Sequence, residues 1–273
     1  MTTQADKART FRALHERDHA FIIPNPWDAG TSRLLDRMGF EALATTSAGY
    51  AFSAGKTDYG VERDEMIAHV GVIAKATHLP VSADLENCWA ESLDGVAETI
   101  RMAAATGIVG GSIEDTTGRP GDPIYEMAEA VDRVRAAVEA ARALPFPFTL
   151  TARAENYLWG RHDLYDTIAR LQAFQQAGAD VLYAPGLTTR EDIAAVISSV
   201  DRPVNVIMGL VGTQTSLEDL SRLGVRRVSV GSALTRAAYG AFLRAAEEMK
   251  THGTFTFAQS AANYRSLSDM FSG

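Results

Sequence analysis

The sequence has very little cysteine and no long apolar segment. Cys88 is the single cysteine, so the chain can form neither an intramolecular disulfide nor a cysteine-based zinc site. A reducing compartment, by default the cytoplasm, is therefore expected. The first residues are polar, and no run approaches the ~20 apolar residues that a bilayer-spanning helix needs. We expect neither export nor insertion into a membrane.

Positive charge is also in short supply. Lysine and arginine total 26 against 34 aspartates and glutamates, which gives a net charge of −8 and a pI near 5.3. The basic residues are scattered, and this argues against binding to nucleic acid, although a local site can still bind a small anion. An apolar fraction of 46% with 22% charged residues excludes wholesale disorder.

Short apolar runs rich in β-branched residues alternate with longer segments of helical periodicity. Eight strands are predicted, at residues 21–25, 42–47, 81–85, 109–114, 149–153, 181–184, 204–208 and 227–231. Helices are predicted at residues 31–38, 63–77, 93–105, 123–143, 164–177, 190–200, 216–223 and 233–251. Eight strand–helix pairs in 273 residues predict an α/β fold, a parallel eight-stranded (β/α)8 TIM-type barrel.

A doubly wound open sheet is the competing fold, but no GxGxxG motif follows the first strand. No linker or change in composition divides the chain, so residues 1–273 are predicted to form a single domain. Residues 116–123, with the sequence TTGRPGDP, combine glycine, proline and small polar side chains. They predict a mobile loop.

Acidic residues follow several of the predicted strands. The carboxyl ends of barrel strands converge on one rim, so Asp58, Asp84, Glu86 and Glu114 are expected to crowd the same mouth. Carboxylates that share a site either take up protons or are neutralised by a cation. Oxygen ligands without cysteine or a histidine triad suit Mg²⁺ or Mn²⁺ rather than Zn²⁺. These four residues are the candidate metal site.

The case for a functional carboxylate differs between positions. In a continuous strand, residues two apart share a face, so Asp84 and Glu86 are both expected to point into the mouth. Asp58 lies further into a loop, and Asp115 is a candidate helix N-cap or surface residue. Cys88 is expected to be a buried thiol, because nothing basic adjoins it to lower its pKa.

Other residues near the predicted rim are candidates for anion binding. Arg153 could hold a substrate carboxylate, pair with Glu114 or Glu155, or do both. The small residues Ser47, Ala48 and Gly49 offer backbone N–H groups at a tight strand exit. Tyr50 and Asn205 are expected to face the pocket, where they either select the substrate or simply pack.

Several motifs, in their order and spacing, carry a resemblance over nearly the whole chain. They are IIPNPWDAGTSRLL, ATTSAGYAFSAGKTDYG, PVSADLEN, GGSIEDTTG, TARAENY, GADVLYAPGL, PVNVIMG and RRVSVGSALTRAAYGAFLRAA. With them the chain resembles the isocitrate lyase and phosphoenolpyruvate mutase superfamily. The resemblance implies a barrel whose mouth binds Mg²⁺ together with a 2-oxo acid. It also implies a homotetramer, often with the C-terminal helix exchanged between subunits.

The resemblance further implies a role for each candidate residue. Asp84 would ligate the metal directly, and Asp58, Glu86 and Glu114 would act through water. The Ser47, Ala48 and Gly49 segment would bind the substrate carboxylate or oxo group, which Arg153 would support.

The chain also departs from the family pattern. Lyases for isocitrate and methylisocitrate carry a KKCGH-type loop after the fourth strand, but residues 116–123 contain no Lys, Cys or His. The small turn that commonly follows the second acid is replaced by the bulkier Asn87-Cys88-Trp89-Ala90, which is expected to narrow the pocket. These differences argue against both of those lyase activities.

The expected function is therefore Mg²⁺-dependent cleavage of a bond at C3 of a 2-oxo acid, through a pyruvate enolate. Decarboxylation of the oxaloacetate type leads, because it needs the least help from residues 116–123. One alternative is a phosphonopyruvate mutase or hydrolase that uses Arg119 in this segment. The other is a non-catalytic barrel that binds a metabolite.

Overall fold

The computed structural model describes residues 2–119, 121–209 and 215–272. Its main sheet has eight parallel strands in the order β1-β10-β9-β8-β7-β4-β3-β2. The Ala44 N–H donates to the Pro24 carbonyl at 3.1 Å and joins the two ends of this order. The strands of this sheet are β1 Phe21–Ile23, β2 Leu43–Ala44, β3 Val81–Asp84, β4 Gly110–Glu114, β7 Thr149–Arg153, β8 Val181–Tyr183, β9 Val204–Ile207 and β10 Arg227–Ser229. The predicted (β/α)8 barrel and all eight of its strands are confirmed.

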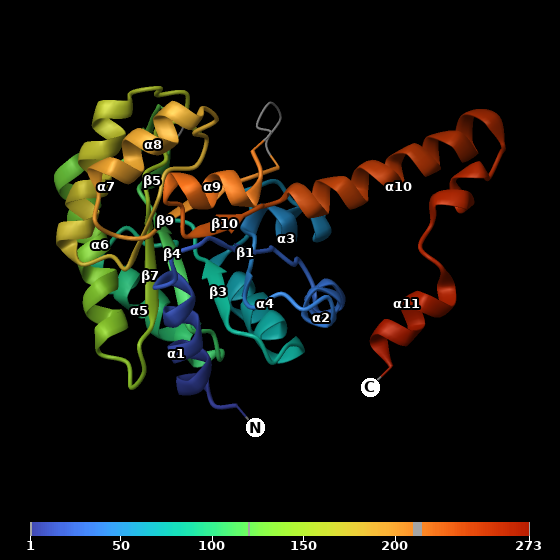
Figure 1. Cartoon of the computed structure of the whole chain (residues 1–273), viewed down its shortest axis with the longest axis horizontal. Coiled ribbons are helices and arrows are strands. Elements are labelled where there is room, and N and C mark those ends of the chain that lie inside the picture. The colour runs from blue at the N-terminus through green and yellow to red at the C-terminus, as the bar shows by residue number, and fades with distance from the viewer. Residues whose placement is uncertain (1, 120, 210–214, 273) are drawn as a thin grey trace.

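Helices surround the barrel (Figure 1). They are α1 Gln4–His15, α2 Ala29–Arg37, α3 Ser47–Ser53, α4 Arg63–Ala76, α5 Leu93–Ala105, α6 Met127–Arg142, α7 Leu164–Ala177, α8 Arg190–Ser199, α9 Leu217–Leu223, α10 Ala233–His252, the 3₁₀ helix η1 Thr256–Ser260 and α11 Tyr264–Phe271. Asp28 caps α2 as a reciprocal capping box with Thr31. No helix in the described part of the chain is long and apolar enough to span a membrane.

Residues 116–123, predicted to be a mobile loop, contain regular structure rather than an irregular loop. Strands β5 Thr116–Arg119 and β6 Asp122–Ile124 form an antiparallel two-stranded sheet there. Gly118 has a φ of +71°, which only glycine adopts readily, and the Thr116 hydroxyl donates to the Pro123 carbonyl. Because β6 occupies residues 122–124, the next helix begins at Met127 rather than at residue 123.

Helix α1, which the periodicity did not predict, covers the end of the barrel where the strands begin. Its Phe11, Leu14 and Ala8 form a small apolar cluster with Phe21 and Ile23 of β1. Gly110 of β4 permits this packing, because a Cβ there would lie 2.8 Å from the Phe11 ring and 2.9 Å from the Thr149 carbonyl. The opposite end, where the strands finish, remains available for a site.

Candidate functional site

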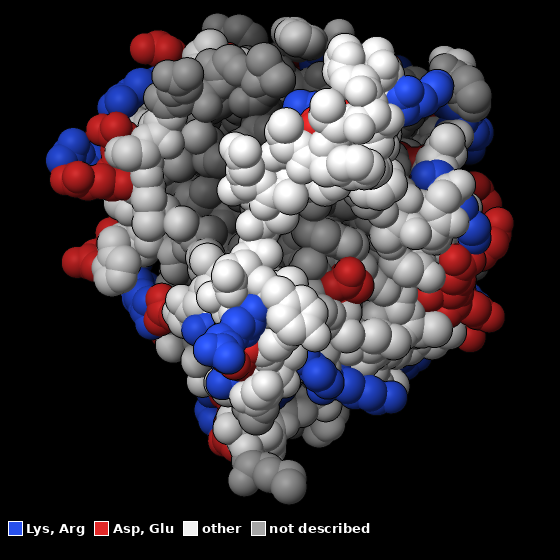
Figure 2. Space-filling view, turned by 90° about the vertical axis from the view of Figure 1, so that its right-hand side faces the viewer, with Lys and Arg blue, Asp and Glu red and all other residues white. Residues whose placement is uncertain are grey.

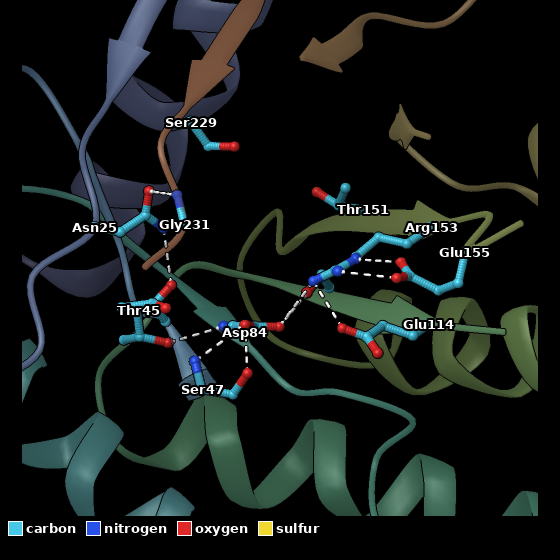
Figure 3. A network of polar contacts seen from close by, with 12 residues as sticks. Asn25, Thr45, Ser47, Asp84, Glu114, Thr151, Arg153, Glu155, Ser229 and Gly231 are labelled. Carbon is cyan, nitrogen blue, oxygen red and sulfur yellow. Dashed lines mark hydrogen bonds and ion pairs between the residues drawn. The ribbon is translucent and has the colours of Figure 1, made fainter. Parts of the chain in front are cut away.

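Strand ends bring a basic side chain and three acidic side chains together at the mouth of the barrel. The parallel register places Glu114 beside Arg153, and Asp84 beside Ser112. The Arg153 guanidinium Nη1 lies 2.7 Å from Glu114 Oε1 and 3.1 Å from Asp84 Oδ1. Its Nε lies 2.7 Å from Glu155 Oε1 (Figure 3). Arg153 was predicted to pair with Glu114 or Glu155, and it pairs with both.

The charges of this cluster depend strongly on one another. Burial raises the pKa of Glu114 well above its usual range, and Arg153 opposes that shift. Burial likewise raises the pKa of Glu155, again against the effect of Arg153. Burial disfavours the charge on Arg153 itself, but the carboxylates outweigh it and hold its pKa well above the ordinary value. Arg153 is thus a fixed positive charge that favours the ionised forms of Glu114 and Glu155 and partly offsets the effect of their burial.

Asp84 is held in one orientation by residues of two neighbouring elements. Its Oδ2 accepts hydrogen bonds from the Ser47 N–H at 3.1 Å and the Ser47 hydroxyl at 2.9 Å. Its own N–H donates to Thr45 Oγ1 at 2.8 Å, and Ser112 Oγ donates to Oδ1 at 3.4 Å. Figure 3 shows Asp84 between Ser47 on one side and Arg153 on the other. The carboxylate is therefore preorganised before any ligand arrives.

Glu86 reaches the same region by a different route from the one predicted. Strand β3 ends at Asp84, and Glu86 has a φ of +45°, so the alternation of strand faces does not place it. Its side chain is nevertheless buried, and burial together with the charges of Asp84 and Asp58 raises its pKa to about 8. Desolvation of its carboxyl group, and then the charge of Asp84, also raise the pKa of Asp58, although Asp58 belongs to an exposed segment.

These acids fit a hard cation electrostatically, but not as a cage of direct ligands. In the described residues, no three His, Cys, Asp or Glu side chains gather closely enough to hold a metal ion. Besides burial, the charge of Asp84 raises the pKa values of Asp58, Glu86 and Glu114, and a divalent cation would relieve that repulsion. The metal roles of the four residues stay a prediction.

The first turn of helix α3 contains Ser47, Ala48 and Gly49. The sequence had predicted a tight strand exit at these residues. Thr46 is the N-cap, and the Gly49 N–H donates to Thr46 Oγ1 at 3.1 Å. Because the Ser47 N–H donates to Asp84, two of these three amides already have partners. A Cβ at Gly49 would lie 2.7 Å from Thr235 Oγ1, so the glycine lets α10 approach this turn.

Contrary to the prediction, Tyr50 does not face the pocket. Its ring stacks on His69 of α4 with centroids 3.7 Å apart, and its hydroxyl donates to Glu65 Oε1 at 3.3 Å. The reason is that Tyr50 lies on a helix, whose turn directs the side chain to α4. Asn205, in contrast, lines a small cavity inside the barrel and donates from Nδ2 to Ser229 Oγ at 2.9 Å.

That cavity has a volume of about 60 Å³, and Asp84 and Arg153 belong to its lining. Most of the polar side chains that line it were not predicted from the sequence. These side chains are Asn25, Thr45, Ser82, Ser112, Tyr183, Arg227 and Ser229. A signal existed, because polar residues at every second position in otherwise apolar strands, as in Arg227-Val228-Ser229, mark an inward face that is not a usual apolar core.

Tyr59 is a second residue that the sequence analysis missed. Its hydroxyl donates to Glu114 Oε2 at 2.9 Å, and its backbone φ is +59°. Burial and then the charge of Glu114 raise its pKa above the ordinary value, so the phenol stays protonated. Its ring lies near Trp159, with centroids 6.2 Å apart. Tyr59 thus brings a proton donor to the acidic cluster.

Asp115 is buried next to the acidic cluster, where it contacts Glu155. It is neither an N-cap nor a surface residue. Its Oδ1 accepts from the Glu155 N–H at 2.8 Å, and its Oδ2 pairs with Arg170 Nη1 at 3.1 Å. Both partners come from elements later in the chain, which the local sequence does not reveal. Cys88 is buried as predicted, and burial raises the pKa of its thiol to about 12.

Comparison with known proteins agrees with this geometry. The family model "Phosphoenolpyruvate phosphomutase" matches residues 11–250. The chain belongs to the phosphoenolpyruvate phosphomutase family. A family member of known structure, from Burkholderia cenocepacia J2315 and described as a lyase/mutase, is 62% identical and has a TM-score of 0.97. The alignment covers 99% of this chain and 97% of that one.

Curated family members have lower identity. The 2-methylisocitrate lyase of Shewanella oneidensis is 29% identical, with 89% of this chain and 85% of that protein covered. The oxaloacetate decarboxylase of Paraburkholderia xenovorans is 28% identical, with 82% and 75% covered. The resemblance deduced from the motifs is thereby confirmed. The protein is an enzyme of the isocitrate lyase and phosphoenolpyruvate mutase superfamily. Its similarity to the lyase and the decarboxylase indicates that it is a carbon–carbon lyase.

Proposed function

We propose that this lyase cleaves the bond between C3 and its substituent in a small 2-oxo acid, with decarboxylation of the oxaloacetate type as the leading reaction. The observation that carries the proposal is the contact of Arg153 with Asp84 and Glu114 at the mouth, in front of a polar cavity. This arrangement brings a fixed cation and a preorganised carboxylate to the place where an enolate would form.

The acidic residues at the mouth would hold a Mg²⁺ or Mn²⁺ ion. Asp84 would be its direct ligand, and Asp58, Glu86 and Glu114 would orient its water molecules. Such a cation supplies Lewis-acid stabilisation of the negative charge that develops on the substrate's oxo oxygen. The raised pKa values of Asp58, Glu86 and Glu114 support this donor set.

The protein's own groups would do the remaining work. Arg153 would orient the oxo acid and stabilise the enolate, while the Ser47 hydrogen bonds keep Asp84 in position. In decarboxylation the C3–C4 bond breaks, CO₂ leaves, and the electron pair remains on the enolate. The phenol of Tyr59 would then donate a proton to C3 and recover one through solvent. No covalent nucleophile is needed.

The β5–β6 hairpin favours this reaction over the alternatives that need a reactive loop. Its Arg119 pairs with Asp122 at 3.2 Å and with Glu91 at 4.0 Å, and half of its side chain is exposed. Neither contact directs it toward Arg153. Of the relatives described above, the oxaloacetate decarboxylase supports the proposed chemistry.

A screen for pyruvate release tests the proposal. Oxaloacetate, 2-methylisocitrate and phosphonopyruvate are each supplied with Mg²⁺ and with EDTA. We expect release from oxaloacetate, loss of activity in EDTA, and a decrease of at least 100-fold in Asp84→Asn. Asp132→Asn, an exposed carboxylate on α6, is the control. Release from phosphonopyruvate alone would establish the P–C alternative, and oxalate binding without any turnover would establish a non-catalytic barrel.

We also propose that the protein is a homotetramer in which the C-terminal arm, α10 to α11, is exchanged between subunits. Helix α10 extends away from the barrel, and the chain then turns back so that α11 packs against α2 (Figure 1). Of the described residues of α10, Thr235 alone is buried. The arm exposes Leu234, Phe242, Leu243, Met249, Phe255, Tyr264, Leu267 and Phe271. Figure 2, from the side of the arm, shows a centre dominated by uncharged residues.

A further inference from the structure

Arg227 is a second arginine inside the barrel, and its surroundings differ from those of Arg153. It lies on β10 with 6% of its surface exposed. Its Nε donates to Asn205 Oδ1 at 2.9 Å, and its Nη2 donates to Thr151 Oγ1 at 3.0 Å. Its Nη1 is buried and has no hydrogen-bond partner among the described residues. Thr151 and Arg153, both labelled in Figure 3, lie on the same strand, β7.

The guanidinium of Arg227 has neutral partners where a buried charge requires an anion. Arg153 pairs with three carboxylates, and the buried Arg170 pairs with two. No ion pair joins Arg227 to a described carboxylate. Burial and the nearby charge of Arg153 lower its pKa to about 10, with Tyr183 opposing the shift, yet Arg227 stays positive at neutral pH. A buried cation that lacks a counter-ion is costly unless a ligand supplies one.

The cavity places this charge where a substrate could reach it. Arg227 lines the same cavity as Asp84 and Arg153. Ser229 also lines it and lies two residues nearer the mouth along β10, so Arg227 forms part of the floor. A volume of about 60 Å³ corresponds to roughly four water molecules, which suits a carboxylate group but not a branched substituent.

Helix α3 offers the substrate's carboxylate fewer free amides than the sequence predicted. The Ser47 and Gly49 amides, expected to bind that group, instead donate to Asp84 and Thr46. A carboxylate that enters the cavity meets Arg227 at its inner end, and one nitrogen of that residue, Nη1, has no hydrogen-bond partner among the described residues. A charge-assisted hydrogen bond there would be stronger than a bond from a neutral amide.

We propose that Arg227 binds the C1 carboxylate of the 2-oxo acid at the floor of the cavity. The inference rests on the proposed function and deepens it, because it assigns the substrate class to compact, unbranched 2-oxo carboxylates. The C3 substituent then lies toward the mouth. In oxaloacetate the departing C4 carboxylate is thereby kept away from Arg227, where a favourable ion pair would oppose its loss as CO₂.

Calorimetric titration with pyruvate and with pyruvamide, both in Mg²⁺, tests the proposal without relying on turnover. Pyruvamide retains the oxo group but has a neutral amide in place of the carboxylate. In Arg227→Gln we expect the affinity for pyruvate to fall about 10- to 100-fold while that for pyruvamide changes less than threefold. Arg227→Lys, which keeps the charge but not the planar fork, should give an intermediate loss for pyruvate.

Arg133→Gln is the matched control. Arg133 is also a buried arginine without a carboxylate partner in the ion pairs described, and it donates to the backbone carbonyls of Asn87 and Glu91 outside the cavity. Its loss should leave the ratio of the two affinities unchanged.

A purely structural role would give a different result. Burial and then the charge of Arg227 lower the pKa of His15 on α1 to about 3, so Arg227 also lies near that helix. If Arg227 served only to hold α1, both ligands would lose affinity alike in Arg227→Gln and Arg227→Lys, and the proposal would be overturned. Unchanged pyruvate binding in a folded Arg227→Gln would overturn it too. If wild-type protein neither binds pyruvate nor releases it from oxaloacetate, the proposed function itself fails.

Discussion

Replacing Arg153 with methionine removes the guanidinium that pairs with three acids, two of which are buried. Met keeps much of the aliphatic volume, so the main loss is the guanidinium. Asp84, Glu114 and Glu155 then face one another without a counter-ion, and the side chains of the two glutamates are at most 2% exposed. Removing one partner of a buried ion pair costs roughly 3–5 kcal/mol.

The size of the expected shift in Tm follows from the length of the chain. For 273 residues the entropy of unfolding is about 0.6 kcal/mol/K. A loss of 3–5 kcal/mol therefore lowers Tm by roughly 5–9 °C. Substrate turnover should disappear as well, because Arg153 also orients the oxo acid in the proposed mechanism.

The loss should depend on pH in a defined direction. Burial raises the pKa of Glu114 and of Glu155, and Arg153 now limits both shifts. Without Arg153 their folded-state pKa values rise further above the unfolded ones, so stability decreases as pH increases through that range. The Tm difference from wild type should be large at pH 8 and smaller at pH 5.

Differential scanning calorimetry without divalent cations measures both effects. Arg135→Met is the control, since Arg135 forms an exposed i,i+3 pair with Asp132 on α6. That variant should shift Tm by less than about 2 °C. A Tm loss in Arg153→Met that is equally small, or that is the same at both pH values, would refute the electrostatic account of the cluster.

Three further predictions concern other parts of the fold. Gly49→Ala should destabilise the protein by about 1–3 kcal/mol in urea unfolding, because the new Cβ would lie 2.7 Å from Thr235 Oγ1; an unchanged midpoint would contradict this close packing. Burial and then Arg227 lower the pKa of His15 to about 3 from an ordinary 6.5, so stability is lost as pH falls below 6.5. His15→Asn should reduce the loss between pH 7 and pH 5 by about 2 kcal/mol, measured by urea unfolding at each pH, and an identical slope would show that this histidine titrates freely. In light scattering, Phe242→Glu with Leu243→Glu should convert a tetramer to smaller species, and an unchanged mass would argue against a role of the arm in assembly.

Much of the fold could be predicted because a parallel barrel repeats one local pattern. Each buried strand is a short apolar run, and each helix has its own periodicity, so the eight strand–helix pairs are visible without long-range information. Helix α3 could not be predicted in this way, since the small residues of Ser47–Ser53 have no apolar stripe. The β5–β6 hairpin was missed because glycine and proline also occur in mobile loops.

The candidate site could likewise be predicted in part, where its residues follow directly from strands. Asp84, Glu114 and Arg153 follow strands, and the topology alone brings strand ends to one rim. The direction of a side chain beyond a strand end is a different matter. Glu86 enters the cluster through a left-handed backbone conformation, and Tyr50 turns away because its helix directs it to α4. Local sequence does not specify either geometry.

The sequence by itself determined the barrel, the acidic rim and the family, since each depends on residues at fixed spacing along the chain. Tertiary structure alone decided which groups satisfy one another. Arg153 meets carboxylates from β3 and β4, as well as Glu155 just beyond its own strand, whereas Arg227 finds neutral partners and keeps one nitrogen unpaired. The physical reason is that the cost of a buried charge depends on what lies within a few ångströms in space, which separation along the chain does not reveal.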